Sequence, residues 1–184
     1  MFEHVSTSFG NFSIRIITKV PSVDPSGLPL GATASAKIFK ALMVDIGLMR
    51  HLTGMPMDVE YHKPDLLNIY RGAMAEQYVG QEMVISQDKD IYYWSRRAKS
   101  SSAEVDYLAV IKGEIFPIEV KSGSSGRLKS MHLCLHNYQN CRKGFVFSTR
   151  SYADLPKQNV TFIPLYFAFS ATYAGKSLKN YFKS

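Results

Sequence analysis

Cysteine is scarce in this chain, whose 184 residues include only Cys134 and Cys141. Two cysteines cannot provide the disulfide framework on which small secreted domains depend, so we expect a reducing compartment. The sequence also lacks any run of about 18 uncharged apolar residues, the length that a membrane-spanning helix needs. Its first residues do not form a basic run followed by an apolar segment, so no secretory signal is recognised. We therefore expect a cytoplasmic protein without a membrane partner.

Acidic residues are almost absent from the last third of the chain. Residues 124–184 contain nine basic side chains and a single acid, Asp154, whereas residues 1–123 contain 13 basic and 14 acidic side chains. The net charge of +7 therefore arises in the C-terminal third. A basic region of this kind is typical of proteins that bind a polyanion, but a solvated basic surface explains it equally well.

The first 33 residues differ in pattern from the rest. Apolar and polar residues alternate near Ile14–Thr18, as in a short strand, and prolines and glycines follow between residues 21 and 31. We expect residues 1–33 to be an N-terminal strand and proline-rich connector, the remnant of an upstream region. Residues 34–184 are long enough to bury a sizeable core and are expected to form one domain.

Hydrophobic periodicity predicts the elements of this domain. Apolar residues spaced by three or four predict helices over residues 34–52, 64–80 and 127–142. Runs rich in β-branched, aromatic or other apolar residues predict strands over 91–94, 103–111, 114–121 and 144–149, and a further apolar run covers 160–169. This order indicates an α/β or α+β fold with a mixed central β-sheet flanked by helices.

The segment 103–121 carries the most specific information. Lys112-Gly113 suits a two-residue hairpin turn, because glycine readily adopts the positive φ that such turns require. With that turn length, Asp106 lies directly across from Glu119, and opposed residues hold their Cβ atoms about 4.5–5.5 Å apart on one face. Lys121 projects from the same face as Glu119 because it lies two residues later. A three-residue turn would break this register.

Asp106 and Glu119 are candidate metal ligands. Two carboxylates held so close repel each other unless a cation bridges them or one is protonated, and Mg²⁺ or Mn²⁺ suits one or two carboxylates with water. Such an ion would activate water for attack on phosphorus, and Lys121 is the candidate catalytic residue that offsets the developing charge. Glu76, on the inward face of the preceding helix, is a further catalytic candidate. The alternatives are a solvated cross-strand charge ladder and, for Glu76, an exposed helix glutamate.

Basic side chains near these carboxylates are candidates for nucleic-acid binding, because their contacts with phosphates provide affinity without reading the base sequence. They are Arg96, Arg97 and Lys99 after the strand at 91–94, Arg127 and Lys129 at the start of the last helix, and Lys143 beyond it. A solvated surface charge is the alternative for each. His132 and His136 have the spacing of a helical zinc pair, but no second pair of ligands is evident.

Several blocks of the sequence resemble a known family. They are Phe39-Lys40 with Asp45-Ile46-Gly47-Leu48, the segment from Gly72 to Glu76, Tyr93-Trp94, Ala103-Glu104-Val105-Asp106-Tyr107 and Pro117-Ile118-Glu119-Val120-Lys121-Ser122-Gly123. Together they resemble the uncharacterised C-terminal domain of bacterial and archaeal AAA-type ATPases, within the PD-(D/E)XK nuclease superfamily. The resemblance covers roughly residues 12–170, with Val105 standing where the superfamily motif has proline.

The resemblance implies a restriction-endonuclease-like fold, with a three-layer core in which helices flank a mixed sheet. It implies Mg²⁺ held by Asp106 and Glu119, with Lys121 catalytic and Glu76 as an accessory acid. It also implies an ATPase domain in the full-length protein and pairing of such domains as a homodimer.

The leading hypothesis is a metal-dependent nuclease, a hydrolase that cleaves phosphodiester bonds in DNA or RNA, with DNA the more expected substrate. The alternative is a nuclease-like module without catalysis that binds nucleic acid or a partner ATPase. A third possibility is a basic structural domain with no role on nucleic acids.

Overall fold

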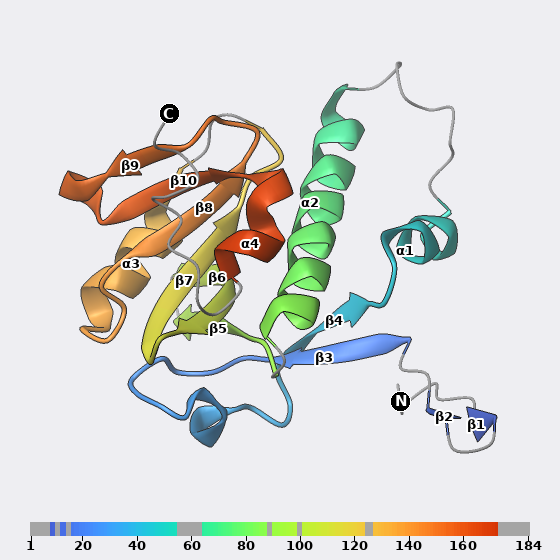
Figure 1. Ribbon diagram of the computed structural model, residues 1–184, viewed down its shortest axis with the longest axis horizontal. Helices are drawn as coiled ribbons and strands as arrows, with labels where there is room; N and C mark the ends of the chain where they lie inside the picture. Colours follow the sequence, from blue (N-terminus) through green and yellow to red (C-terminus); the bar gives the residue numbers. More distant parts are fainter. Residues whose placement is uncertain are drawn as a thin grey trace.

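A mixed sheet of six strands forms the centre of the molecule (Figure 1). In the computed structural model the described residues are 8–9, 12–13, 16–54, 64–87, 90–98, 101–123 and 127–172. The strands lie in the order β5 (Tyr92–Ala98), β6 (Ser101–Ile111), β7 (Glu114–Val120), β8 (Gly144–Ser148), β10 (Val160–Pro164) and β9 (Ala153–Leu155). The pairs β7–β8 and β8–β10 are parallel and the other pairs are antiparallel. The expected α/β fold with a mixed central sheet is confirmed.

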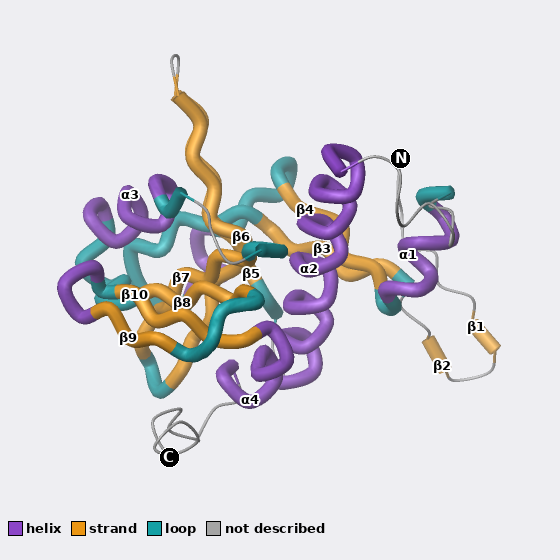
Figure 2. Tube along the Cα trace, turned by 90° about the horizontal axis from the view of Figure 1, so that it is seen from above, coloured by secondary structure: helices purple, strands orange, loops and turns teal. Residues whose placement is uncertain are grey.

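Helices cover both faces of this sheet. The long helix α2 (Pro64–Gln87) lies on one face with α4 (Ala168–Thr172), and α3 (Lys129–Asn137) lies on the other (Figure 1 and Figure 2). The remaining helical elements of the described residues are α1 (Ile46–Leu52) and the 3₁₀ turns η1 (Leu30–Thr33), η2 (Pro156–Gln158) and η3 (Leu165–Phe167). Within these ranges, no helix combines the length and the apolar character needed to cross a membrane.

Alternating side chains on the strands create a hydrophobic core on each face. Phe147 of β8 belongs to a cluster with Val79 and Met83 of α2. Its neighbour Val146 points the other way and belongs to a second cluster with Met131 of α3. All five side chains are fully buried, so the sheet is sandwiched between two apolar layers.

A two-stranded ribbon stands beside the main sheet. It is formed by β3 (Ile17–Pro21) and β4 (Phe39–Met43), and the two-residue strands β1 (Ser8–Phe9) and β2 (Phe12–Ser13) pair separately. Val20 and Leu42 of the ribbon are buried in the core beneath α2. Ser22 forms an isolated bridge with Tyr93 of β5, so part of residues 1–33 packs with the remainder of the chain.

The helix expected from residue 34 onward is wrong in its first half. Phe39–Met43 forms β4, and α1 begins only at Ile46. Ile38, which a helical apolar stripe would bury, is exposed, and pairing with β3 satisfies the backbone of the segment instead. Asp45 starts α1 by accepting a hydrogen bond at 2.8 Å from the backbone N–H three residues later.

Other boundaries differ by less. The expected helix at 64–80 continues to Gln87, and the helix expected over 127–142 is limited to α3, which ends at Asn137. The apolar run that starts at Val160 is a strand only as far as Pro164, and the edge strand β9 was not predicted.

Candidate metal centre

The β6–β7 hairpin has the predicted register. Lys112 and Gly113 form a two-residue turn with φ values of 52° and 79°. The strand pairs run from Ile111 with Glu114 to Tyr107 with Ile118. This register brings Asp106, the next residue of β6, to the end of β7.

β6 carries a β-bulge beside this position. Its pairing with β5 shifts by one residue between two pairs, Tyr92 with Leu108 and Trp94 with Val105. Between these two pairs β6 has two residues, Asp106 and Tyr107, where β5 has only one. Tyr107 is buried beneath α2, and its hydroxyl donates a hydrogen bond at 2.9 Å to the backbone oxygen of Glu76. The bulge therefore joins β6 to α2 next to Asp106.

Asp106 lies where the ladder between β6 and β7 ends. Its Oδ2 accepts a hydrogen bond at 2.7 Å from the backbone N–H of Val120, so the carboxylate takes the place of a backbone acceptor. The expected direct pair of Asp106 with Glu119 falls outside the ladder, because the last pair is Tyr107 with Ile118. Beyond this point β7 continues its pairing with β8 instead.

Four carboxyl groups gather here, and we call them the acid cluster: Glu76 of α2, Glu104 and Asp106 of β6, and Glu119 of β7. Lys40 of β4 lies among three of them. Its Nζ is 2.7 Å from an Oε1 atom of both Glu76 and Glu104 and 3.5 Å from Asp106 Oδ1. Elements far apart in the sequence thus supply one ionic network.

Glu119 is the most buried glutamate of the cluster, with 10% of its side chain exposed. Its Oε1 accepts a hydrogen bond from Lys121 Nζ at 2.5 Å. Its Oε2 is buried and accepts no hydrogen bond from any described residue. A buried carboxylate oxygen without a donor is costly, so this atom is available to a cation or a water molecule.

Burial and, after it, the crowding of negative charge raise the pKa values of the acids in this site. Burial, Glu76 and Glu119 raise the pKa of Asp106 from 3.8 to about 7, although Lys40 and the Val120 N–H act in the opposite direction. Burial also raises the pKa of Glu119, against the effect of Lys121. Burial lowers the pKa of Lys40, but the attraction of Glu76 and Asp106 outweighs it and the net shift is upward.

The oxygen donors of the acid cluster suit at most a minimal site for a divalent ion. Within the described ranges, no group of three or more histidine, cysteine, aspartate or glutamate side chains is placed to hold a metal. Mg²⁺ requires less from a protein, because one or two carboxylates with water and substrate phosphate oxygens complete its shell. The unpartnered Glu119 Oε2 fits such a minimal site, together with Asp106, whose pKa is raised by burial and by the charges of Glu76 and Glu119.

The basic candidates lie in different settings. Arg96 and Arg97 are exposed on β5 and line a cavity of about 430 Å³ with Glu104, which places them next to the acid cluster. Arg127 and Lys129 are exposed at the start of α3. Lys143 Nζ is 2.7 Å from Asp154 Oδ1, so it forms an ion pair within the fold. Lys99 lies outside the described residues.

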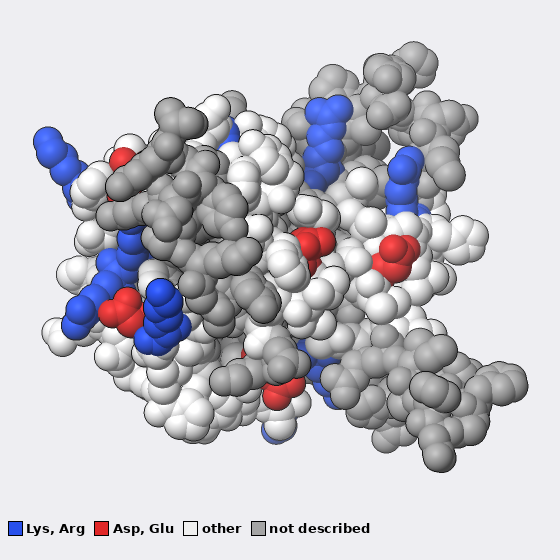
Figure 3. Space-filling model, in the orientation of Figure 1, with Lys and Arg blue, Asp and Glu red and all other residues white. Residues whose placement is uncertain are grey.

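Basic and acidic side chains are interspersed on the face shown in Figure 3, where basic ones gather mainly on the side of β9, β10 and α3. His132 and His136, the possible zinc pair, are both exposed on α3. Neither belongs to a metal-holding group among the described residues.

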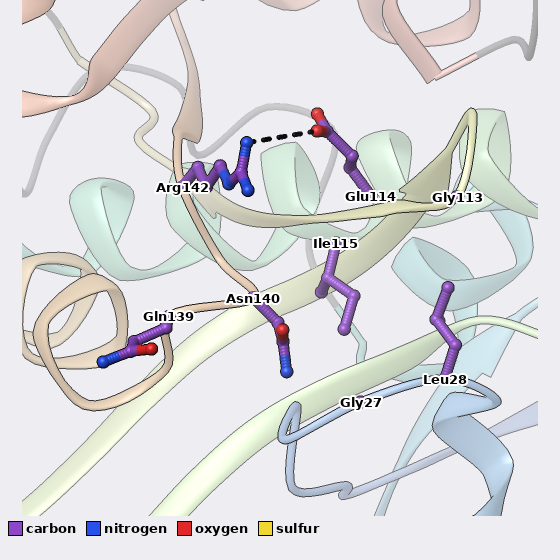
Figure 4. A pocket seen from close by; sticks show the side chains of 8 residues that line it. All are labelled: Gly27, Leu28, Gly113, Glu114, Ile115, Gln139, Asn140 and Arg142. Carbon is purple, nitrogen blue, oxygen red and sulfur yellow. Dashed lines mark ion pairs between the residues drawn. The ribbon is translucent and has the colours of Figure 1, made fainter.

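A separate cavity of about 370 Å³ lies at the turn end of the hairpin (Figure 4). It is lined by Leu28, Gly113, Ile115 and Asn140, among others. Arg142 and Glu114 also line it, with 4.0 Å between Nη1 of the arginine and Oε1 of the glutamate. None of the acid cluster lines this cavity, so it is not part of the candidate metal centre.

Two residues of the centre escaped sequence reasoning as site residues, Lys40 and Glu104. The apolar spacing of residues 34–52 predicts a helix at Lys40, and its neighbours in the network lie 36 or more positions away, so no local pattern reveals them. The one available signal was a lysine in an otherwise apolar run, Phe39-Lys40-Ala41-Leu42.

The fold and site describe an α/β protein with a partly buried acid cluster at the end of a central hairpin. A family model described as "Domain of unknown function (DUF4143)" matches residues 71–180, and the chain belongs to this family. The match includes Glu76, Asp106, Glu119 and Lys121, whereas Lys40 lies outside it. Comparisons with curated proteins and with solved structures found no match.

Proposed function

We propose that this chain is a Mg²⁺- or Mn²⁺-dependent nuclease domain with a restriction-endonuclease-like core of the PD-(D/E)XK type. The observation that carries the proposal is the buried, unpartnered Oε2 of Glu119 close to Asp106, whose pKa is raised to about 7. Both features are those of a carboxylate pair in need of a cation.

The residues have distinct roles in this proposal. Asp106 and Glu119 would hold the ion, which would supply Lewis-acid polarisation of a phosphate oxygen and a lower pKa for attacking water. The Val120 N–H fixes Oδ2 of Asp106, and Lys121 fixes Oε1 of Glu119. Glu119 therefore keeps Oε2 for coordination, and Asp106 would offer Oδ1, which lies 3.5 Å from Lys40 Nζ. Lys121 also brings positive charge to where a phosphate would develop negative charge. Glu76 is an accessory acid near the ion.

The proposed substrate is a nucleic acid, with DNA favoured over RNA. The cavity beside the acid cluster supports a nucleic-acid substrate, because Arg96, Arg97 and the hydroxyl groups of Ser95, Ser102 and Ser130 line it. Such groups bind phosphates and position a backbone without reading its sequence. Attachment to an AAA-type ATPase and pairing as a homodimer belong to the same proposal.

The test compares Glu119→Gln with Glu114→Gln, a matched change on the same strand at an exposed position. We expect cleavage of plasmid and single-stranded DNA with Mg²⁺ or Mn²⁺, lost in Glu119→Gln and in Lys121→Ala and retained in Glu114→Gln. Circular dichroism and melting temperature check that each variant is folded. Absence of cleavage by the unmutated chain with either metal contradicts the proposal.

A non-catalytic module that binds nucleic acid or a partner ATPase is the second candidate. One observation favours it, because the ammonium group of Lys40 already neutralises part of the acid cluster. This candidate predicts salt-sensitive binding to DNA that survives Glu119→Gln, with no cleavage under any metal condition.

A further inference from the structure

Lys40 is held more tightly than a surface lysine. Only 18% of its side chain is exposed, and its ammonium group contacts Glu76, Glu104 and Asp106. The same Nζ lies 4.9 Å from the centre of the Tyr93 ring and 5.7 Å from that of Tyr107. A cation surrounded by carboxylates and aromatic faces, out of contact with most water, occupies a built cation site.

The charge balance of this site is incomplete. Four carboxyl groups of the acid cluster face two ammonium groups, those of Lys40 and Lys121. When all are ionised, two negative charges remain. Burial raises the pKa of Asp106, and the charges of Glu76 and Glu119 raise it further. A divalent cation has the charge that would restore neutrality, so the cluster attracts it even with Lys40 present.

Lys40 lies closer to two of the acids than to the third. Its Nζ is 2.7 Å from Oε1 of Glu76 and of Glu104, but 3.5 Å from Oδ1 of Asp106. A cavity of about 190 Å³ lies between β4 and α2, and Lys40, Glu76 and Tyr107 line it. The ammonium group therefore has room to withdraw from Asp106 while remaining beside Glu76.

We infer that Lys40 is the resident cation of the acid cluster and that a divalent ion binds at Asp106 and Glu119 in competition with it. The inference rests on the proposed metal site and adds a regulation of that site. The ribbon strand β4 supplies this lysine, so a displacement of the ribbon that moves Lys40 away from Asp106 would raise the affinity of the site for its metal. Lys40 is a positioning residue in this scheme, because it acts through Asp106.

Calorimetric titration with Mn²⁺ alone tests the competition. We expect Lys40→Met to bind Mn²⁺ about tenfold or more tightly than the unmutated chain, because a positive charge next to a ligand is removed. Lys40→Arg keeps the charge and should not gain affinity. Lys19→Met is the matched control, since Lys19 lies on the paired strand 4.9 Å from the Phe39 ring and has no carboxylate of the cluster beside it.

A second measurement needs no substitution at the site. In a chain labelled with ¹⁵N-lysine, the Nζ signal of Lys40 should shift when Mg²⁺ saturates the protein, whereas the signal of Lys19 stays in place. An unchanged Lys40 signal at saturation overturns the inference even if Lys40→Met does not fold.

The outcomes separate this inference from the proposed function. If the unmutated chain and Lys40→Met bind Mn²⁺ with equal affinity, the competition by Lys40 is wrong, but the proposed metal site is supported. Uptake only in Lys40→Met supports the competition and favours the non-catalytic module. No uptake in either chain overturns both proposals.

Discussion

Tyr107 reaches α2 because residue 80 is glycine. A Cβ atom built at Gly80 would lie 2.5 Å from the Tyr107 hydroxyl oxygen and 2.6 Å from Leu42 Cδ1, both far closer than atoms approach without bonding. The absence of that atom lets the hydroxyl bond to the Glu76 backbone, one helical turn earlier. Gly80 therefore determines how closely the bulge of β6, with Asp106, lies against Glu76.

Gly80→Ala should lower the free energy of unfolding by about 1–3 kcal/mol, because the added methyl group overpacks a buried contact. Gly72→Ala on the same helix is the matched control. No neighbour lies within 4 Å of a Cβ at Gly72, so alanine should stabilise the helix by about 0.5–1 kcal/mol. Urea unfolding followed by the fluorescence of Trp94 gives both values. Equal effects of the two substitutions would show that Tyr107 has freedom to move aside.

Gln77 attaches the ribbon to α2. Its Oε1 accepts a hydrogen bond from Met43 N at 3.1 Å and its Nε2 donates one to Met43 O at 2.6 Å, so a buried side chain completes the backbone pairing of β4. Gln77→Ala should cost about 2–4 kcal/mol, since it leaves both backbone groups without these partners. Gln81→Ala removes a single bond to Val44 O and should cost less than about 1 kcal/mol. Denaturant melts with equal midpoints for the two variants contradict this.

Nucleic-acid affinity should depend on Arg96 and Arg97 but not on Lys143. The two arginines are exposed beside the acid cluster, whereas Lys143 is already paired with Asp154. In fluorescence anisotropy with a duplex oligonucleotide, the double alanine variant should show a salt dependence shallower by about 1–2 in the log–log slope. Lys143→Ala should retain the unmutated slope. A loss of slope only in Lys143→Ala would place the binding surface near β8 and β9 instead.

The hairpin could be predicted because its determinants are local. Lys112 and Gly113 set the turn, and the turn sets every pair up to Tyr107 with Ile118. Asp106 departs from the simple register because β5, outside the hairpin, imposes the bulge. No pattern within segment 103–121 contains that information.

The ribbon and its lysine could not be predicted for a related reason. The segment 38–46 contains apolar residues at helical spacing, but pairing with β3 forms a strand there. That pairing joins residues about 20 positions apart, and only the tertiary fold then brings Lys40 to Glu76 on α2. Glu76, Asp106, Glu119 and Lys121 were identified as candidates from side-chain chemistry, whereas the cation that links three of the acids was not.

Asp106 should make the stability of the metal-free protein fall with rising pH. Its pKa is about 7 in the fold against 3.8 for the ordinary residue. Between these values the folded chain holds a proton that the unfolded chain has lost, so the free energy of unfolding decreases as pH rises from about 4 to 7. Asp106→Asn removes this titration and should be more stable than the unmutated chain at pH 8 by about 1–3 kcal/mol in the presence of EDTA.

The comparison at low pH isolates the effect of this proton. Near pH 4 a protonated Asp106 and an asparagine have similar shape and charge, so the stability advantage of Asp106→Asn should vanish there. Glu114→Gln, a change at an exposed carboxylate, should follow the pH curve of the unmutated chain. Urea melts at several pH values measure all three curves. If Asp106→Asn is instead the less stable protein at pH 8, the prediction is wrong. The ionised carboxylate is then stabilised more by Lys40 and the Val120 N–H than it is destabilised by burial and by Glu76 and Glu119.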